Sequence, residues 1–291
     1  MSILDCGDWQ AIPSKISDEL NAVSQQCLAD IAASSGCKIV AAGFIGSRMI
    51  GIYNQTSDYD IRAITTGTST EVAISKNYEY GSFKIDIKAY PFERIASDID
   101  RWRQIDKTYP SLHCIPEEPL VHNDVFRSQF RLVLQNPIYA DGTFFRVNKG
   151  VILDGILLCD QLDYDYIRAY MNYNKFLQGE EVYLRKYLYT FYEIASINWA
   201  LGRGTFCPDF IAGCAEYPFP PEITGIVTQM LEMNRGCVSK ENAFVKQNPL
   251  LNEYISGTLL HLRERIENSC VKNMRQNHLH IPCLKHILGV L

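Results

Sequence analysis

Three aspartates stand in segments that otherwise have the alternating pattern of β-strands: Asp58, Asp60 and Asp86. One residue separates Asp58 from Asp60, and side chains two apart in a strand point to the same face. Aspartate is depleted in strands and like charges on one face repel, so this pair conflicts with local preference unless a cation lies between the carboxylates. Asp86 is centred in Lys-Ile-Asp-Ile-Lys, another alternating segment. Together the acids predict a site for a hard divalent cation, Mg²⁺ or Mn²⁺.

A Gly-Ser pair upstream of the acids is suited to bind phosphate. Gly46 and Ser47 end an apolar run and precede a segment that can form a helical turn, where backbone N–H groups and a hydroxyl meet an anion. The alternative is that Asp58 and Asp60 lie in a surface turn, because Ser-Asp-x-Asp is common there. Three acids combined with a Gly-Ser turn favour a single site over the surface turn.

The first half of the chain has mixed helical and strand patterns that must position these residues. Residues 16–35 have apolar positions at helical spacing, and Ser17 precedes an acidic first turn that suits the helix dipole. Alternating or short apolar runs predict strands, and a proline at a first helical position predicts a further helix at 91–107. The predicted strands are residues 38–46, 57–64 and 83–90.

After a turn-rich stretch around 136–150, the remaining segments have helical spacing. The predicted helices cover residues 162–179, 180–203, 220–236 and a long stretch from Ser239, with Gly179, Gly202 and Gly236 at helix ends. A boundary near Gly150 divides the chain into a mixed domain, 1–150, and a helical domain, 151–291, expected to close the substrate cleft. The expected fold class is α+β, a mixed sheet with flanking helices followed by a helical domain.

The composition of the 291 residues excludes several classes of protein. With 47% hydrophobic and 21% charged residues, the chain has no run of roughly 18 apolar residues, so no membrane span is expected. The N-terminus has acids and no basic segment before an apolar one, and the ten cysteines form no Cys-x-x-Cys pair, so a cytoplasmic protein is expected. A net charge of −5 argues against nonspecific nucleic-acid binding over the whole surface, although a local basic groove is compatible with it.

Gly46-Ser47, followed by Asp58-x-Asp60 and a third acid on a later strand, resembles the polymerase-β nucleotidyltransferase superfamily. More narrowly, Gly-Ser-Arg-x-x-Gly at 46–51 and Ser-Asp-Tyr-Asp-Ile-Arg at 57–62 resemble the predicted nucleotidyltransferases known as RNA-ligase-associated polymerase-β-like proteins. The resemblance covers roughly residues 40–210 and includes further segments at 86–88, 107–112 and 185–189, the last leading to Trp199. Tyr109 and Tyr192 depart from it, standing where relatives have asparagine and commonly arginine, which affects nucleotide contacts rather than the acids.

The resemblance implies roles for these residues in moving a nucleoside monophosphate from a nucleoside triphosphate to an acceptor hydroxyl. Asp58 and Asp60 would bind two divalent ions, and Asp86 would complete the catalytic-ion site and help to deprotonate the acceptor. Gly46 and Ser47 would hold the β- and γ-phosphates.

Positive side chains must complete a triphosphate site, and the candidates are Arg48, Lys186 and Arg62. Arg48 follows Ser47, and strand alternation places Arg62 on the face of the acids. Lys84 and Lys88 share the face of Asp86 and either approach phosphate or balance the acids. The alternative for each cation is a solvated surface position, as for most Lys and Arg.

Two weaker patterns lie in the helical half. Tyrosines at helical spacing favour core packing over base stacking: Tyr164, Tyr166, Tyr170, Tyr173, Tyr183, Tyr187, Tyr189 and Tyr192. Near the C-terminus Cys270, His278, His280, Cys283 and His286 are crowded together, but their spacing fits no common zinc module, and a basic helical end that packs or touches RNA is favoured.

The association of the narrower family with RNA ligase implies an RNA end as acceptor, in RNA repair or processing, with tRNA one possible substrate. Two alternatives stay open. One is nucleotidyl transfer to a protein or small molecule, and the other is a catalytically silent domain that binds RNA or a partner protein on the same scaffold. Loss of incorporation with retained RNA binding in Asp58→Ala would separate the enzyme from the silent domain.

Overall fold

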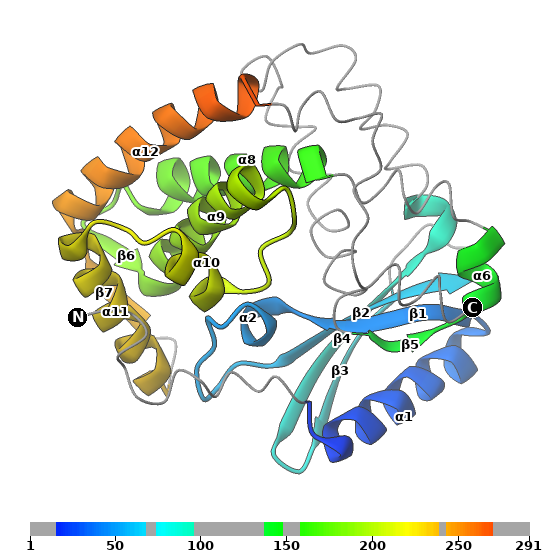
Figure 1. The fold of residues 1–291 in the computed structure, drawn as a ribbon. Coiled ribbons are helices and arrows are strands. Elements are labelled where there is room, and N and C mark those ends of the chain that lie inside the picture. The colour runs from blue at the N-terminus through cyan, green and yellow to red at the C-terminus, as the bar shows by residue number, and fades with distance from the viewer. Residues whose placement is uncertain (1–15, 68–73, 96–136, 148–157, 239–242, 270–291) are drawn as a thin grey trace. The chain divides into compact units, whose positions relative to one another are not determined.

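The computed structural model describes residues 16–67, 74–95, 137–147, 158–238 and 243–269. The chain divides into two compact units, one built on a β-sheet and one helical (Figure 1). Among the described residues, the sheet unit extends to Val147 and the helical unit continues from Leu158. The expected boundary near Gly150 lies outside the described residues and stays a prediction. Unexpectedly, Ser47–Ser57 belongs to the helical unit although strands of the sheet precede and follow it.

The sheet unit has five strands in the order β3-β4-β2-β1-β5. Strands β2 and β4 run parallel, whereas β1 pairs antiparallel with β2 and β5, and β3 pairs antiparallel with β4, so the sheet is mixed as expected. Together with the helical unit this confirms the α+β fold class. The strands are β1 (Lys38–Ile45), β2 (Tyr59–Thr66), β3 (Ile74–Tyr80), β4 (Phe83–Pro91) and β5 (Pro137–Ala140).

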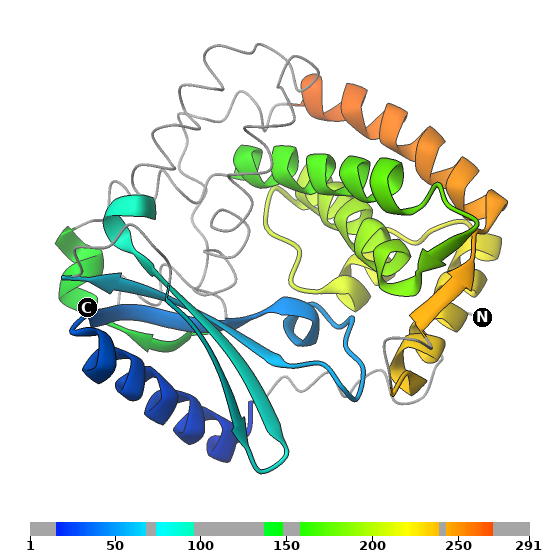
Figure 2. The ribbon, with the colours of Figure 1, turned by 180° about the vertical axis from the view of Figure 1, so that it is seen from behind.

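Helix α1 (Asp18–Ser35) covers one face of the sheet (Figures 1 and 2). The Oγ of Ser17 accepts a hydrogen bond from the N–H of Leu20 at 3.1 Å, which confirms the predicted helix start. From β3, Tyr78 donates its hydroxyl to the carbonyl of Cys27 at 3.3 Å in α1. Tyr78 is in register with Ile85, and Ile85 with Tyr59, so these side chains share the helix-covered face. Side chains one position away in each strand point to the opposite face.

Three local features of the sheet unit differ from the sequence expectation. Strand β3 was not predicted, because its polar residues hide the alternation. The stretch expected to be turn-rich contains β5 and a short helix, α6 (Gly142–Val147). Pro91 ends β4 instead of beginning a helix, and the helical residues 92–95 follow it.

The helical unit is arranged around α9 (Leu184–Arg203), which packs against four other helices. Tyr187, Leu188 and Phe191 on α9 are fully buried, since α9 faces neighbours on several sides. The segment 180–203 is not one continuous helix, because a short strand, β6 (Glu181–Tyr183), pairs with β7 (Phe244–Lys246) before α9 begins. The neighbouring helices are α8 (Leu158–Phe176), α10 (Phe210–Glu216), α11 (Pro221–Gly236) and α12 (Pro249–Glu267).

Within the described ranges, no helix combines the length and the apolar character that a membrane crossing requires.

Candidate active site

The two acids in the sheet lie directly opposite each other. Strands β2 and β4 pair in parallel with Asp60 in register with Asp86, and both side chains lie on the face opposite α1. Asp58 immediately precedes β2 and is exposed. The fold therefore brings Asp60 and Asp86 together on adjacent strands, with Asp58 at the entrance to β2.

Gly46 closes one side of Asp60. Gly46 follows β1, has a φ of 80°, and a Cβ built on it would lie 2.7 Å from the Cγ of Asp60. Both the left-handed backbone and the lack of space require glycine here. Gly46, the first residue of the Gly-Ser pair that the sequence singled out, is thus held against the acid by the β1–β2 pairing, in which Ile45 is in register with Asp60.

Arg62 lies among the acids on the same face of β2. Its Nη1 is 3.3 Å from the Oδ2 of Asp86 and donates to the carbonyl of Ile61 at 3.0 Å, and its Nη2 is 3.8 Å from the Oδ1 of Asp60. The Nζ of Lys88 is 3.8 Å from the Oδ2 of Asp86. Arg62, predicted as a phosphate contact, therefore pairs with both strand acids in this structure, and Lys88 balances Asp86.

Burial raises the pKa of Asp60 to about 6. The neighbouring charge of Arg62 opposes this shift, while Asp86 and Asp58 add to it by like-charge repulsion. The cations on this face therefore do not fully compensate the acids, and a further positive charge would stabilise the ionised form of Asp60.

The donor set fits a divalent cation in its chemistry, because carboxylate oxygens are the ligands that Mg²⁺ and Mn²⁺ prefer. Across the part of the chain that the structure describes, no three Asp, Glu, His or Cys side chains are already gathered as a group that could hold a metal ion. Arg62 occupies the space between Asp60 and Asp86, so a cation that bridged them would have to displace its guanidinium.

Ser47 and Arg48 lie in helix α2 (Gly46–Met49). A helical turn was predicted at this place, directly after the first strand. The carbonyl of Ser57 accepts hydrogen bonds from the Nε and Nη2 of Arg48 at 3.0 and 2.7 Å. The guanidinium of Arg48 also lies 5.4 Å from the centre of the Tyr53 ring. Arg48 therefore joins the two ends of the loop that leads from the Gly-Ser pair to Asp58.

Ser57 also receives a contact that sequence reasoning missed. Its Oγ accepts from the Nη2 of Arg185 at 2.6 Å, and the Nε of Arg185 donates to the Oδ1 of Asn234 at 3.2 Å. Asn234 in turn donates its Nδ2 to the carbonyl of Tyr53 at 3.2 Å. The signal in the sequence was the place of Arg185 in the segment 185–189, which carries part of the resemblance. These long-range bonds explain why Ser47–Ser57 belongs to the helical unit.

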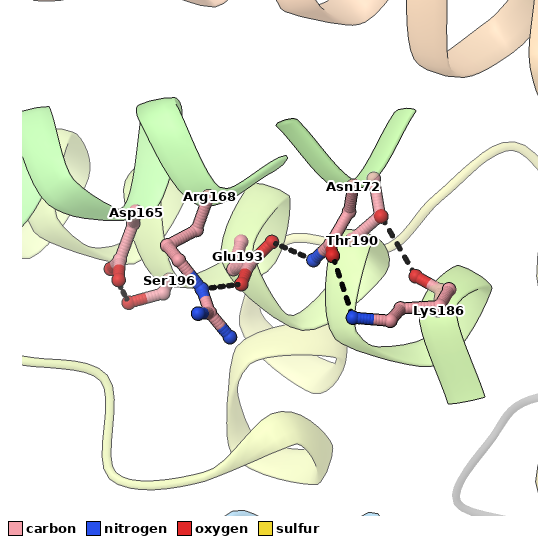
Figure 3. Close-up of polar contacts among 7 residues, drawn as sticks. All are labelled: Asp165, Arg168, Asn172, Lys186, Thr190, Glu193 and Ser196. Carbon is pink, nitrogen blue, oxygen red and sulfur yellow. Dashed lines mark hydrogen bonds and ion pairs between the residues drawn. The ribbon is translucent and has the colours of Figure 1, made fainter. Parts of the chain in front are cut away.

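Lys186, the other predicted phosphate contact, lies in the first turn of α9. Its Nζ donates to the Oδ1 of Asn172 at 3.3 Å (Figure 3). The same Nζ lies 3.9 Å from the centre of the Phe176 ring. Asn172 donates its Nδ2 to the Oε2 of Glu193 at 3.2 Å. A buried polar network in the helical unit therefore holds Lys186.

The tyrosines of the helical unit include buried rings that pack in the core and an exposed ring at its edge. Tyr187 is fully buried, and its hydroxyl donates to the Oδ1 of Asn252 at 2.7 Å. Tyr170 is exposed and stacks on Tyr166, with ring centres 6.3 Å apart.

The C-terminal cysteines and histidines, residues 270–286, and the segment 107–112 with Tyr109 lie outside the described residues.

No family model matches this chain. The uncharacterized protein YcgL of Bacillus subtilis (strain 168) is 28% identical over 231 residues, which cover 76% of this chain and 76% of that protein. Among solved structures, the chain is similar to a nucleotidyltransferase-like protein from Exiguobacterium sibiricum 255-15, with a TM-score of 0.32 and 11% identity over 93% of this chain and 87% of that one. At these levels of similarity, a function has to be argued from the residues of this chain.

Proposed function

We propose that this protein is a metal-dependent nucleotidyltransferase that moves a nucleoside monophosphate from a nucleoside triphosphate to an acceptor hydroxyl. The observation that carries the proposal is the opposition of Asp60 and Asp86 on β2 and β4, with the backbone of Gly46 against Asp60. A glycine lets its backbone lie against the carboxylate, so a phosphate held by backbone N–H groups there would lie near a cation held by the acids.

The proposal gives each acid a task. Asp58, Asp60 and Asp86 would hold two divalent ions, Mg²⁺ or Mn²⁺, and Asp86 would accept the proton of the attacking hydroxyl. The bound ions would supply charge neutralisation at the α-phosphate and at the leaving pyrophosphate. The raised pKa of Asp60 is consistent with this task, because an incompletely compensated carboxylate gains most from a bound cation.

The resemblance implies which groups would hold the phosphates. Gly46 and Ser47 would donate backbone N–H groups and a hydroxyl to the β- and γ-phosphates. Arg48 and Lys186 would add positive charge. Arg62 balances the charges of Asp60 and Asp86 in this structure, and its guanidinium would turn to the nucleotide phosphates if the acids held divalent ions.

The proposed acceptor is an RNA end, in RNA repair or processing in the cytoplasm. This finer assignment depends on the resemblance of residues 46–51 and 57–62 to RNA-ligase-associated nucleotidyltransferases.

The test is incubation of the protein with Mg²⁺, each α-labelled nucleoside triphosphate in turn and a total RNA pool. We expect label on RNA with the wild type, and a rate at least about a thousandfold lower with Asp60→Asn or Asp86→Asn, because each removes a charged metal ligand. Glu79→Gln is the matched control, since Glu79 is an exposed acid on β3 outside the acid pair, and it should retain the wild-type rate.

The other results separate the alternatives. Label on the protein itself or on a small soluble acceptor would replace RNA as the acceptor while keeping the reaction. Nucleotide or RNA binding without transfer of label to any acceptor would contradict an enzyme and favour the silent binding domain.

A further inference from the structure

A continuous line of polar contacts connects two cations across helices α8 and α9 (Figure 3). The Nε of Arg168 donates to the Oε1 of Glu193 at 3.5 Å, and the Oε2 of Glu193 accepts from Asn172 at 3.2 Å. The Oδ1 of Asn172 accepts from the Nζ of Lys186 at 3.3 Å. One carboxylate and one amide therefore fix both Arg168 and Lys186.

The inner and outer members of this line differ in exposure. Glu193 and Asn172 are buried, whereas the side chain of Arg168 is 34% exposed and Lys186 is half-buried. Arg168 uses its Nε toward Glu193, and in Figure 3 the rest of its guanidinium extends away from that carboxylate. The cationic ends are thus more exposed than the carboxyl group that lies between the helices.

Stability alone gives little reason to keep a carboxylate at position 193. A buried acid loses its hydration, and well-packed apolar residues in place of a buried ion pair are often neutral or stabilising. Burial raises the pKa of Glu193 to about 8, with Asp165 adding to the shift and Arg168 and Asn172 opposing it. An orienting role for the two cations accounts for the acid better than packing does.

Aromatic rings restrict the same two cations further. The guanidinium of Arg168 lies 5.8 Å from the centre of the Tyr164 ring, and the Nζ of Lys186 lies 3.9 Å from that of Phe176. A long cationic side chain loses rotational freedom when it binds an anion, so cations that are already restrained bind phosphate with a smaller entropy cost.

A second buried acid on α8 provides a contrast. Asp165 accepts a hydrogen bond from the Oγ of Ser196 at 2.6 Å, from the same pair of helices. Ser196 therefore offers a control position with similar burial and the same helix pair.

We propose that Arg168 and Lys186 form a two-cation site for the phosphate groups of a ligand, and that Glu193 and Asn172 are positioning residues for it. The inference rests on the proposed function for Lys186 and extends it by naming Arg168, Asn172 and Glu193. Phosphate groups come either from a nucleoside triphosphate or from an RNA chain, and both present oxygens to guanidinium and ammonium donors.

The first test is calorimetric titration of the full chain with tripolyphosphate in the absence of divalent ions, which leaves the acid site out of the measurement. We expect Arg168→Gln and Lys186→Gln each to weaken binding about tenfold or more, the usual effect of losing one charge-assisted contact. Ser196→Ala should bind as the wild type does. Wild-type affinity in both glutamine variants would overturn the inference.

The second test separates positioning from a general structural role through a double-mutant cycle. Asn172→Leu should weaken tripolyphosphate binding in the wild-type background and have little further effect in Lys186→Gln, because Asn172 acts through Lys186. An equal loss in both backgrounds, at an unchanged melting temperature, would contradict the positioning role. Glu193→Gln retains the shape of the side chain and should weaken binding less than Asn172→Leu does.

Competition identifies the source of the phosphate groups. Displacement of tripolyphosphate by ATP but not by a single-stranded RNA oligonucleotide assigns the site to the nucleotide, and the reverse result assigns it to RNA.

Failure of this inference can be told from failure of the proposed function. A protein that transfers nucleotides but binds tripolyphosphate equally well without Arg168 and Lys186 contradicts the inference alone, whereas one that binds through these cations and transfers nothing contradicts the proposed function alone.

Discussion

An acid–cation pair of the sheet and one of the α8–α9 helix pair differ in which partner is more buried. In the sheet the most buried charge is a cation, because the side chain of Arg62 is 8% exposed and that of its partner Asp60 is 28% exposed. In the helix pair the acid is the more buried partner, because the side chain of Glu193 is 6% exposed and that of Arg168 is 34% exposed. In these two pairs the more exposed partner is an acid in the sheet, which attracts cations, and a cation in the helix pair, which attracts anions.

The largest effect is expected from removing Arg62, the buried cation of the sheet. Arg62→Met leaves Asp60 and Asp86 facing each other without their shared partner, and we expect a loss of about 3 kcal/mol in the free energy of unfolding, since breaking a buried ion pair strands a charge. Millimolar Mg²⁺ should restore part of that stability, because a divalent ion would take the vacated place. Urea unfolding with and without Mg²⁺ measures both effects, and a variant as stable as the wild type would contradict the role of Arg62.

Gly46→Ala tests how tightly the sheet holds its acids. The new Cβ would meet Asp60 in a backbone of positive φ, so a loss of about 2 to 3 kcal/mol in the free energy of unfolding is expected. Gly67→Ala is the matched control, since Gly67 has a φ of 81° and no atom within 4 Å of the added Cβ. The difference between the two variants isolates the contact with Asp60. Equal losses would show that only the backbone matters.

Glu193→Gln probes the inner acid of the helix pair through pH. The pKa of Glu193 is raised to about 8, so the folded protein binds a proton that the unfolded chain releases, and wild-type stability falls as pH rises from the ordinary glutamate pKa toward about 8. The glutamine variant lacks this dependence. We therefore expect it to gain about 1 to 2 kcal/mol relative to the wild type between about pH 6 and about pH 8. Parallel stability curves over that interval would contradict a protonated Glu193.

The smallest effect is expected for Lys88→Gln. Lys88 lies 3.8 Å from the Oδ2 of Asp86, but its side chain is 40% exposed, and exposed ion pairs contribute roughly 0 to 1 kcal/mol. Chemical denaturation should detect a loss well below that of Arg62→Met. A comparable loss would show that burial does not distinguish the two cations on this face.

The strand positions of Asp60 and Asp86 could be predicted from sequence, because the alternating pattern around them is local. Asp86 interrupts an alternating strand within five residues, and Asp60 lies within a similar segment. The partner of Asp60 and Asp86 could not be predicted, because it depends on the register of β2 with β4, which are separated in sequence by β3. Sequence spacing placed Arg62 on the correct face but could not show that its guanidinium pairs with the acids.

The polar contacts between α8 and α9 could not be predicted from local sequence patterns, for a similar reason. Glu193 was one acid in an apolar helical segment, and only the packing of α8 against α9 brings Arg168 and Asn172 to it. An acid on the apolar face of a helix was the signal available. The membership of Ser47–Ser57 in the helical unit likewise depends on hydrogen bonds between residues far apart in the chain.

Those distant bonds have a consequence for the order in which the protein is completed during synthesis. Ser57 bonds Arg185 across 128 residues, and Tyr53 bonds Asn234 across 181. Contacts of such long sequence separation form late, because a large loop must close first. The segment that leads into Asp58 thus obtains its partners only after the ribosome has delivered α9 and α11, and a nascent chain carrying the acids would lack that support until most of its length had emerged.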